Sequence, residues 1–267
     1  MSAVGYGTGT VLYETGTVLG RHLQRIRHAP GVVILTQTMP INMLLFFGYV
    51  FGSALATPGE QYRAFLVPGL LASTAAGGIM TGMFQAAQDV QRGVMDRFRT
   101  MPMSRVAVPL GQTAADVLTT AVGMVPLILV GLAVGWRIDG SVPGACGAFG
   151  LLLLFRFAAN WLGTCLGLLI RNEEAAGQLG AATFVLPLLS NAYIPTAGLP
   201  DWLRTVAEWN PISALATAVR VLCDDTARPT NAAWPVTHPV PGTLLWSLLL
   251  LLLFAPLAVR RYANSRE

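Results

Sequence analysis

The chain is built of long apolar runs that alternate with short polar stretches. A helix needs about 20 apolar residues to cross a bilayer, and most of these runs reach that length. The pattern predicts six spans, at residues 31–56, 64–87, 106–134, 143–170, 175–194 and 242–259. We expect the fifth to be interrupted at Pro187, while Gly78 and Gly82 in the second have the spacing of close helix packing. The expected fold class is an all-α integral membrane protein.

A charged stretch at residues 88–105 separates the second run from the third. Four apolar residues recur in it at steps of four, four and three: Val90, Val94, Phe98 and Met101. This is the spacing of one helix face, and Arg92, Asp96 and Arg99 lie on the other side. Pro102 lacks a backbone donor and would end the helix. We therefore predict a short amphipathic helix against which a cytoplasmic partner pushes; the alternative is an interfacial loop whose arginines only anchor the topology.

The stretch before the first run also has helix periodicity. Leu19, Leu23 and Ile26 share one face of residues 14–28, and arginines occupy the other. Such a pattern predicts an N-terminal amphipathic helix that lies in the membrane surface. A flexible basic tail is the alternative.

Residues 195–225 are too polar and proline-rich for a simple span. They contain two short periodic segments, at 201–209 and 212–222, which the Asn210-Pro211 dipeptide separates. We expect a pair of helices that re-enters the outer leaflet, with tryptophans at the interface. An ordinary external loop is the alternative. Residues 226–240 then form a proline-rich outer connector.

The composition agrees with a membrane protein and excludes several functions. Charged residues make up only 11% of the chain and hydrophobic residues 54%, whereas a soluble domain has about 25% charged residues. All 17 basic residues are arginine, so the chain lacks the lysine of a Walker A phosphate loop. The arginines flank the apolar runs and form no stripe, which argues against nucleic-acid binding. The three cysteines have no ligand spacing, so we expect no metal site.

The positions of the arginines predict the topology, because short cytoplasmic loops carry an excess of them. With the N-terminus inside, eleven are cytoplasmic: Arg21, Arg25, Arg27, Arg92, Arg97, Arg99, Arg105, Arg171, Arg260, Arg261 and Arg266. Five are outside: Arg63, Arg137, Arg204, Arg220 and Arg228. We therefore expect a multi-pass protein of the cell membrane with both termini cytoplasmic. Its parts are a tail with the amphipathic helix (1–30), a transmembrane domain (31–259) and a second tail (260–267).

Two ionisable residues fall within predicted spans, Asp116 in the third and Arg156 in the fourth. Charges at such depth are costly and point to function. Asp116 lies eleven residues from Arg105, and Arg156 lies fifteen from Arg171. At about 1.5 Å of rise per residue their depths differ by about 6 Å, which two side chains can bridge. We hypothesise an Asp116–Arg156 pair; alternatively each faces water or a dimer partner.

Six strings of residues occur in an order that resembles a known family: 62–69, 96–105, 169–176, 190–195, 199–203 and 208–211. Together they are similar to the permease subunits of ABC-2-type exporters, in particular the daunorubicin-resistance DrrB-like group of actinobacteria. The resemblance extends from about residue 21 to residue 261. Each string alone is weak, but six in order on a six-span chain of this length are specific. An arginine at position 156 departs from the apolar or small residue expected there.

The resemblance implies the ABC-2, or type V, exporter fold: six membrane helices, the N-terminal amphipathic helix and a re-entrant pair before the last span. It implies the permease subunit of an ABC transporter that moves an amphipathic drug, antibiotic or lipid-like substrate out of the cell, as in multidrug efflux and antibiotic resistance. The chain would pair with a second copy or a close paralogue on two ATPase subunits. ATP and Mg²⁺ would bind to those subunits, so no cofactor and no enzyme activity are expected in this chain.

Residues 88–105 would be the coupling helix of such a permease. The residues expected to transmit force from the ATPase are Asp89, Arg92, Asp96, Arg97, Phe98, Arg99, Glu173 and Glu174. Glu173 and Glu174 are adjacent on a short cytoplasmic loop, for which an ordinary solvated loop is the plainer interpretation. The resemblance suggests that this loop also contacts the ATPase.

A substrate path is expected along the first and fifth spans, lined by Gln37, Asn42, Phe46, Phe47, Asn191 and Tyr193. Apolar walls with a few polar groups suit an amphipathic cargo. The histidines have no acidic or cysteine partners at useful spacing, so no catalytic constellation is predicted. The alternatives are a glycan, polysaccharide or lipid exporter permease of the same fold, or an ATP-independent carrier or channel.

Overall fold

The computed structural model describes residues 37–52, 59–92, 107–170, 172–224, 229 and 231–264. The predicted amphipathic helix at residues 14–28 lies outside these ranges. Most of the predicted coupling helix lies outside them too, including Asp96, Arg97, Phe98 and Arg99.

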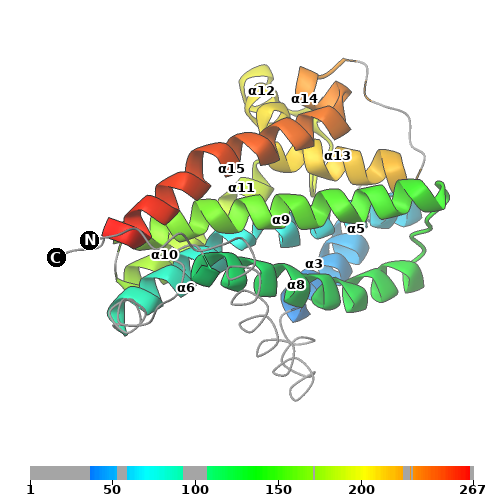
Figure 1. Ribbon diagram of the computed structural model, residues 1–267. Coiled ribbons are helices and arrows are strands. Elements are labelled where there is room, and N and C mark those ends of the chain that lie inside the picture. Colours follow the sequence, from blue (N-terminus) through cyan, green and yellow to red (C-terminus); the bar gives the residue numbers. More distant parts are fainter. Residues whose placement is uncertain are drawn as a thin grey trace.

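Every regular element in the described ranges is a helix, as the apolar periodicity predicts (Figure 1). The first half of the chain forms α3 (Thr38–Phe46), the π-helix η1 (Phe47–Phe51), α5 (Gly59–Ala76), α6 (Gly78–Gln91), α8 (Ala107–Ala133) and α9 (Val142–Ile170). The second half forms α10 (Glu173–Ala182), α11 (Val185–Leu188), η2 (Thr196–Gly198), α12 (Asp201–Trp209), α13 (Pro211–Cys223), α14 (Trp234–Thr237) and α15 (Pro239–Asn264).

Four stretches among the described residues are long and apolar enough to cross a membrane: Gln61–Gln91, Pro109–Ala133, Val142–Ile170 and Pro239–Arg261. They coincide with the second, third, fourth and sixth predicted spans. Two shorter apolar helices, Thr38–Val50 and Pro211–Cys223, accompany them. The chain is therefore a multi-pass membrane protein, and its described part is built of helices.

The fifth predicted span differs from the expectation. Its helix α10 ends at Ala182, and a turn at Thr183 and Phe184 separates it from the single turn of α11. The break does not fall at Pro187, which is the third residue of α11. A proline is tolerated there because the first backbone N–H groups of a helix have no partner within it. Beyond α11, residues 189–194 form turns and a bend.

The last span also begins earlier than predicted. Helix α15 starts at Pro239, three residues before the expected start at 242. Pro239 and Pro241 stand in its first turn, where a missing N–H costs nothing. The expected connector at 226–240 is therefore partly helical, since it contains α14 as well. By contrast, α12 and α13 match the two predicted short helices, and Asn210 caps α13 by accepting a hydrogen bond from the N–H of Ile212 at 2.9 Å.

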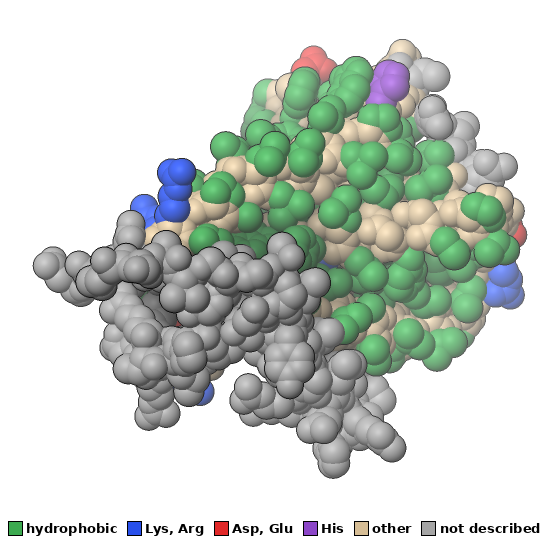
Figure 2. Space-filling model, viewed as in Figure 1, with side chains coloured by type: hydrophobic (Ala, Val, Ile, Leu, Met, Phe, Trp, Pro, Cys, Tyr) green, Lys and Arg blue, Asp and Glu red, His purple; other side chains and the backbone are tan. Residues whose placement is uncertain are grey.

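Many apolar side chains are exposed on the surface of the bundle (Figure 2). On α15 alone, seven leucines are exposed: Leu244, Leu245, Leu248, Leu249, Leu252, Leu253 and Leu257. The visible face of Figure 2 carries hydrophobic side chains over most of its described area, with arginines near its two ends. Soluble proteins do not expose apolar surface on this scale, whereas lipid tails accept it.

Glycines on both helices permit a close crossing of α6 and α9. A Cβ on Gly82 would lie 2.3 Å from the carbonyl oxygen of Asn160. In the opposite direction, a Cβ on Gly163 would lie 2.1 Å from the carbonyl oxygen of Ile79, and one on Gly167 would lie 2.2 Å from that of Met83. Close packing was expected at Gly78 and Gly82, and the same spacing recurs at Gly163 and Gly167. Such paired small residues let membrane helices pack backbone to backbone.

Candidate functional site

Asp116 on α8 and Arg156 on α9 form a bidentate ion pair. Arg156 Nε donates to Asp116 Oδ2 and Arg156 Nη2 donates to Asp116 Oδ1, each at 2.7 Å. Both side chains are buried. Parallel, charge-assisted bonds of this length are among the strongest hydrogen bonds in proteins. The structure thus contains the pair that the sequence suggested, and neither charge faces water alone.

The same guanidinium reaches the second span at the point where that span breaks. Between α5 and α6, Gly77 forms a turn. On one side of it, the carbonyl oxygen of Thr74 accepts from Arg156 Nη1 at 2.9 Å, and on the other side Thr81 Oγ1 accepts from Nη2 at 3.0 Å. A Cβ on Gly78 would lie 2.8 Å from the Arg156 carbonyl oxygen, so this approach requires glycine. One side chain therefore links three spans.

Asn160, one turn further along α9, completes the cluster. Its Nδ2 donates to Asp116 Oδ2 at 3.0 Å, and its Oδ1 accepts from Thr113 Oγ1 at 3.1 Å. Thr164 Oγ1 also points at this oxygen, at 3.4 Å. Each polar group in this buried cluster thus has a partner, as burial in a low-dielectric interior requires. The cluster can hold helices together, and it contains no nucleophile beside a base.

A second set of polar contacts joins the helix ends near the predicted coupling segment. We call this end of the bundle the coupling end. Gln88 Nε2 donates to Glu173 Oε1 at 3.1 Å, which ties α6 to α10. Gln112 Nε2 donates to Asp89 Oδ2 at 2.8 Å, which ties α8 to α6. The α10 N-terminus is capped by Asn172, whose Oδ1 accepts from the Ala175 N–H at 3.1 Å.

A surface hollow of about 530 Å³ opens at the coupling end, lined by Phe84, Gln91, Asn172, Glu173, Glu174 and Gly177. Of the predicted coupling residues, the structure thus brings Asp89, Glu173 and Glu174 to one end of the bundle, and Arg92 caps the same end of α6. Glu174 is exposed, whereas Glu173 is half-buried by its bond to Gln88.

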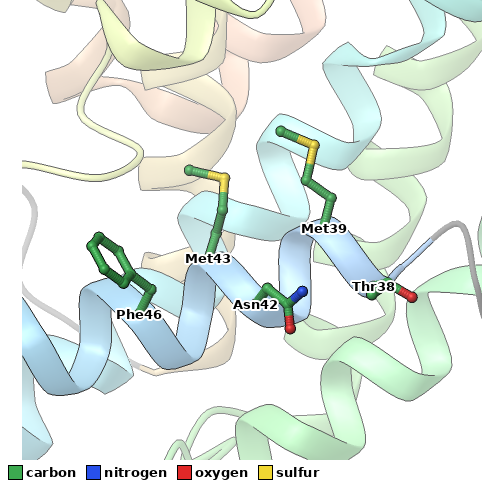
Figure 3. Close-up of a pocket in the computed structure, with 5 residues that line it drawn as sticks. All are labelled: Thr38, Met39, Asn42, Met43 and Phe46. Atoms are coloured by element: carbon green, nitrogen blue, oxygen red, sulfur yellow. The ribbon is translucent and has the colours of Figure 1, made fainter.

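A hollow of about 570 Å³ lies along α3, and Thr38, Met39, Asn42, Met43 and Phe46 line it (Figure 3). Asn42 and Phe46 belong to the predicted substrate path. Both side chains are exposed, and together with the two methionines they form an apolar wall with one amide group. Flexible methionine side chains adapt to ligands of different shape.

The other predicted path residues lie elsewhere. Gln37 is buried at the start of α3. The rings of Phe47 and Tyr193 stack, with centroids 5.9 Å apart. Asn191 is buried against Arg220 on α13, whose Nη2 donates to the Asn191 carbonyl oxygen at 2.9 Å. Arg220, one of the five arginines expected on the outer side, is thus buried within the protein.

The opposite end of the bundle, which we call the far end, holds two loops together. Trp136, after α8, donates from Nε1 to Asp224 Oδ1 at 2.8 Å, and the Gly140 N–H donates to the Cys223 carbonyl oxygen at 2.8 Å. Burial raises the pKa of Asp224 to about 6, because the bond from Trp136 and the charge of Arg220 only partly offset the loss of hydration. Long-range contacts such as these have no signal in the sequence pattern.

Known proteins resemble this chain over most of its length. A family model described as ABC-2 type transporter matches residues 13–223. The daunorubicin resistance ABC transporter permease protein of Streptomyces coeruleorubidus is 33% identical over 261 residues, which cover 96% of this chain and 88% of that protein. The doxorubicin resistance ABC transporter permease protein of Mycobacterium tuberculosis is 24% identical over 84% of this chain and 80% of its own length. A putative transport permease of Pyropia yezoensis is 23% identical over 80% of this chain and 75% of its own.

Proposed function

This chain belongs to the ABC-2 type transporter family, and we propose that it is the permease subunit of an exporter that moves an amphipathic, drug-like molecule out of the cell. The observation that carries the proposal is its similarity, across 96% of its length, to a permease named for daunorubicin resistance. Such a subunit supplies the membrane path, while a separate ATPase subunit supplies the energy.

The chain's own residues support this division of labour. No lysine occurs anywhere in the 267 residues, so a Walker A loop cannot be formed. ATP and Mg²⁺ would bind to the partner subunit. We assign the coupling end to the cytoplasm, where Glu173, Glu174 and the end of α6 offer an acidic and polar surface to that subunit.

Coupling would begin at the end of α6. Closure of two ATPase subunits would press on residues 89–99, and α6 would transmit the movement because it is tied to α10 through Gln88 and Glu173. The Asp116–Arg156 cluster lies further along the same helices and would make α6, α8 and α9 move as one unit. Spans one, two and five, with those of a second permease copy or a close paralogue, would then open outward.

The cargo path would include the hollow along α3. Its exposed Phe46, its methionines and the amide of Asn42 suit a flat, amphipathic molecule, because aromatic and thioether groups stack on ring systems while the amide orients a polar group. In this proposal the complete fold has six spans and the α12–α13 pair re-enters the outer leaflet. Both termini are then cytoplasmic, in the cell membrane of an actinobacterium.

An ATP-independent proton-coupled carrier is a weaker candidate. Such a carrier needs a carboxylate within the membrane that exchanges protons with water. Asp116 is buried, and both of its oxygens accept hydrogen bonds from Arg156 or Asn160. The carboxylate is therefore held inside the cluster and away from water. A lipid or glycan exporter of the same fold would use the same coupling end and differ only in its path.

The proposal is tested by measuring ATP hydrolysis by the partner. An ATP-binding-cassette subunit co-expressed with this chain should copurify with it, and daunorubicin should stimulate its hydrolysis in nanodiscs. Replacement of Phe98 and Arg99 by alanine should reduce the stimulation while the permease still inserts into the membrane. The variant Glu173→Ala should reduce it as well, because α10 loses its bond to α6. Failure of any such subunit to copurify, or unchanged stimulation in all variants, would overturn the proposal.

A further inference from the structure

Residues 189–194, between α11 and η2, run as irregular backbone inside a helical protein. Backbone groups at membrane depth must find partners when no helix supplies them. This segment is pressed directly against α5, because a Cβ on Gly69 would lie 1.8 Å from the carbonyl oxygen of Ala192. We call residues 190–193 the buried turn; Ser190, Asn191, Ala192 and Tyr193 are all buried.

One face of α13 carries the partners of the buried turn. Ser213, Thr217 and Arg220 follow one another at steps of four and three, so they share a side of the helix. Ser213 Oγ accepts from the Asn191 N–H at 2.9 Å, and Thr217 Oγ1 accepts from Asn191 Nδ2 at 2.8 Å. All three side chains are buried. This face of α13 therefore holds Asn191 through both its backbone N–H and its side-chain amide.

Arg220 makes further hydrogen bonds from α13 to the buried turn. Its Nη2 donates to the carbonyl oxygens of Asn191 at 2.9 Å and of Ala192 at 3.3 Å, and its Nη1 donates to Asn191 Oδ1 at 3.3 Å. Nε and Nη2 also donate to the carbonyl oxygen of Phe65, and the guanidinium lies 3.7 Å from the centroid of the Phe65 ring. The planar guanidinium of arginine can donate to several carbonyl oxygens at once, whereas the ammonium group of a lysine lacks this geometry.

Arg156 is paired with a carboxylate, whereas no carboxylate accepts a hydrogen bond from Arg220 among the described residues. Among the described residues, its acceptors are backbone and amide oxygens, while the nearby carboxylate of Asp224 accepts from Trp136 instead. Burying an arginine in this way is costly, and a neutral side chain would satisfy fewer carbonyl oxygens. A functional benefit would offset this cost if transport depends on the position of the last residue of the buried turn.

Tyr193 is the last residue of the buried turn. Its carbonyl oxygen accepts from Tyr62 Oη at 3.1 Å, so its backbone is fixed from α5 as well. Its ring stacks on Phe47 of η1, with 24° between the ring planes. Phe47 in turn packs edge-on against Phe46, whose side chain lines the hollow along α3. A continuous aromatic series thus leads from the buried turn to the hollow.

We propose that Arg220 is a positioning residue for cargo transport: it fixes the buried turn so that Tyr193 presents its ring to Phe47 and shapes the wall of the path beside the α3 hollow. This inference rests on the proposed function, because it takes the hollow as part of the path. Arg220 does not touch the cargo and acts through Tyr193. It therefore determines affinity for aromatic cargo more than the maximal rate.

The kinetic test uses daunorubicin as the probe and the full complex of permease and ATPase in inverted vesicles. R220Q should raise the KM for ATP-dependent uptake about tenfold, equivalent to about 1.4 kcal/mol, with the maximal rate within about twofold. R220K should recover part of the loss. The milder variant Thr217→Val removes the acceptor of the Asn191 amide and one bond to the Ser213 carbonyl oxygen within α13, and leaves the Arg220 contacts in place. It should raise KM in the same direction but less. Arg137→Gln, the same change on an arginine of the far-end loop, is the matched control and should leave KM unchanged.

The link through Tyr193 has its own test. Y193A and R220Q should each raise KM, and the double variant should be no worse than the worse single variant, because both remove the same ring from the same place. Additive effects would show that Arg220 does not act through Tyr193. A lower maximal rate and yield at unchanged KM would show that Arg220 only stabilises the fold. Either result would overturn the inference.

A measurement without transport separates the inference from the proposed function. Cysteines replace Phe47 and Tyr193 in a chain whose own Cys146, Cys165 and Cys223 are changed to alanine, and a short bifunctional thiol reagent joins them in nanodiscs. The cross-linking yield should fall at least about threefold when R220Q or Thr217→Val is added, because the turn loses its anchor. Equal yields would overturn the inference. If the wild-type complex moves no daunorubicin, the proposed function fails, and this yield still decides whether Arg220 positions the turn.

Discussion

The guanidinium of Arg156 on α9 holds both carboxylate oxygens of Asp116 on α8, between helices that otherwise bury mostly apolar side chains. With its remaining donors it also bonds to residues on either side of the break at Gly77 in the second span. The pair is thus the point where three spans meet. If a partner pushes on the end of α6, this cluster makes the neighbouring helices follow.

Replacing one member of this pair should destabilise the protein more than replacing both. Asp116→Leu or Arg156→Met leaves one buried charge without its partner, which costs about 3–5 kcal/mol, whereas the double variant leaves none and should recover much of the loss. The free energy of unfolding in mixed detergent micelles, followed by circular dichroism, measures the difference. A double variant no more stable than the weaker single variant would count against a coupled pair.

The crossing of α6 and α9 should be sensitive to single methyl groups. Gly163→Ala places a Cβ 2.1 Å from the Ile79 carbonyl oxygen, so the helices must separate, and we expect a loss of about 1–3 kcal/mol. Gly150→Ala is the matched control on the same helix, since a Cβ there would lie more than 4 Å from any atom outside the local helix backbone. There the change should be neutral or stabilise by up to about 1 kcal/mol, because alanine favours the helix. Thermal unfolding midpoints of the two variants test this, and equal midpoints would refute the close crossing.

The contribution of the far end to the stability of the folded protein should fall as pH rises. The pKa of Asp224 is about 6 in the folded protein and its ordinary value is 3.8, so the folded state binds this proton more tightly than the unfolded state does. Its contribution is present below pH 4 and is lost as pH rises through 6. We expect a loss of about 1–2 kcal/mol between pH 4 and pH 7, after allowing for partial hydration. The free energy of unfolding at each pH, followed by circular dichroism, measures this loss.

Asp224→Asn supplies the control for this pH dependence. Its amide oxygen still accepts from Trp136 Nε1, but the side chain no longer titrates. The variant should therefore show a flat stability profile between pH 4 and pH 7 where the wild type declines. The other charged groups that act on Asp224, Asp139 and Arg220, remain in both proteins. The same slope in wild type and variant would assign the titration to another group.

The hollow along α3 should determine which molecules are carried. Phe46→Ala removes an exposed ring from its wall and should raise the KM for daunorubicin by about tenfold, since aromatic contacts are worth about 1 kcal/mol beyond the area they bury. Leu45→Ala is the control, because Leu45 is a similarly exposed neighbour that does not line the hollow. Uptake by inverted vesicles measures both. Equal effects of the two changes would place the path elsewhere.

The sequence predicted what depends on local periodicity and on burial in lipid. The long spans and the bounds of α12 were predictable because an apolar run or face leaves few alternatives. The Asp116–Arg156 pair was predictable because two charges in neighbouring spans at similar depth have few other partners. Both inferences rest on the cost of exposing polar groups to hydrocarbon.

The features that the sequence did not predict depend on contacts between distant segments. Arg220 was counted among the outer arginines because a count of charges cannot separate a flanking arginine from one that holds backbone carbonyl oxygens. The steps of four and three through Ser213, Thr217 and Arg220 were the available signal. The second glycine pair on α9 and the Trp136–Asp224 bond have meaning only once their partners are placed.

The central claim is that force from a second polypeptide drives export through this chain. It is tested most directly by daunorubicin accumulation in proteoliposomes that contain the purified permease, with and without its ATP-binding-cassette subunit. The account predicts accumulation only when the permease, the ATPase subunit and ATP are all present, and none when the ATPase carries a changed Walker A lysine. Accumulation by the permease alone, at the same rate with and without ATP, would contradict it.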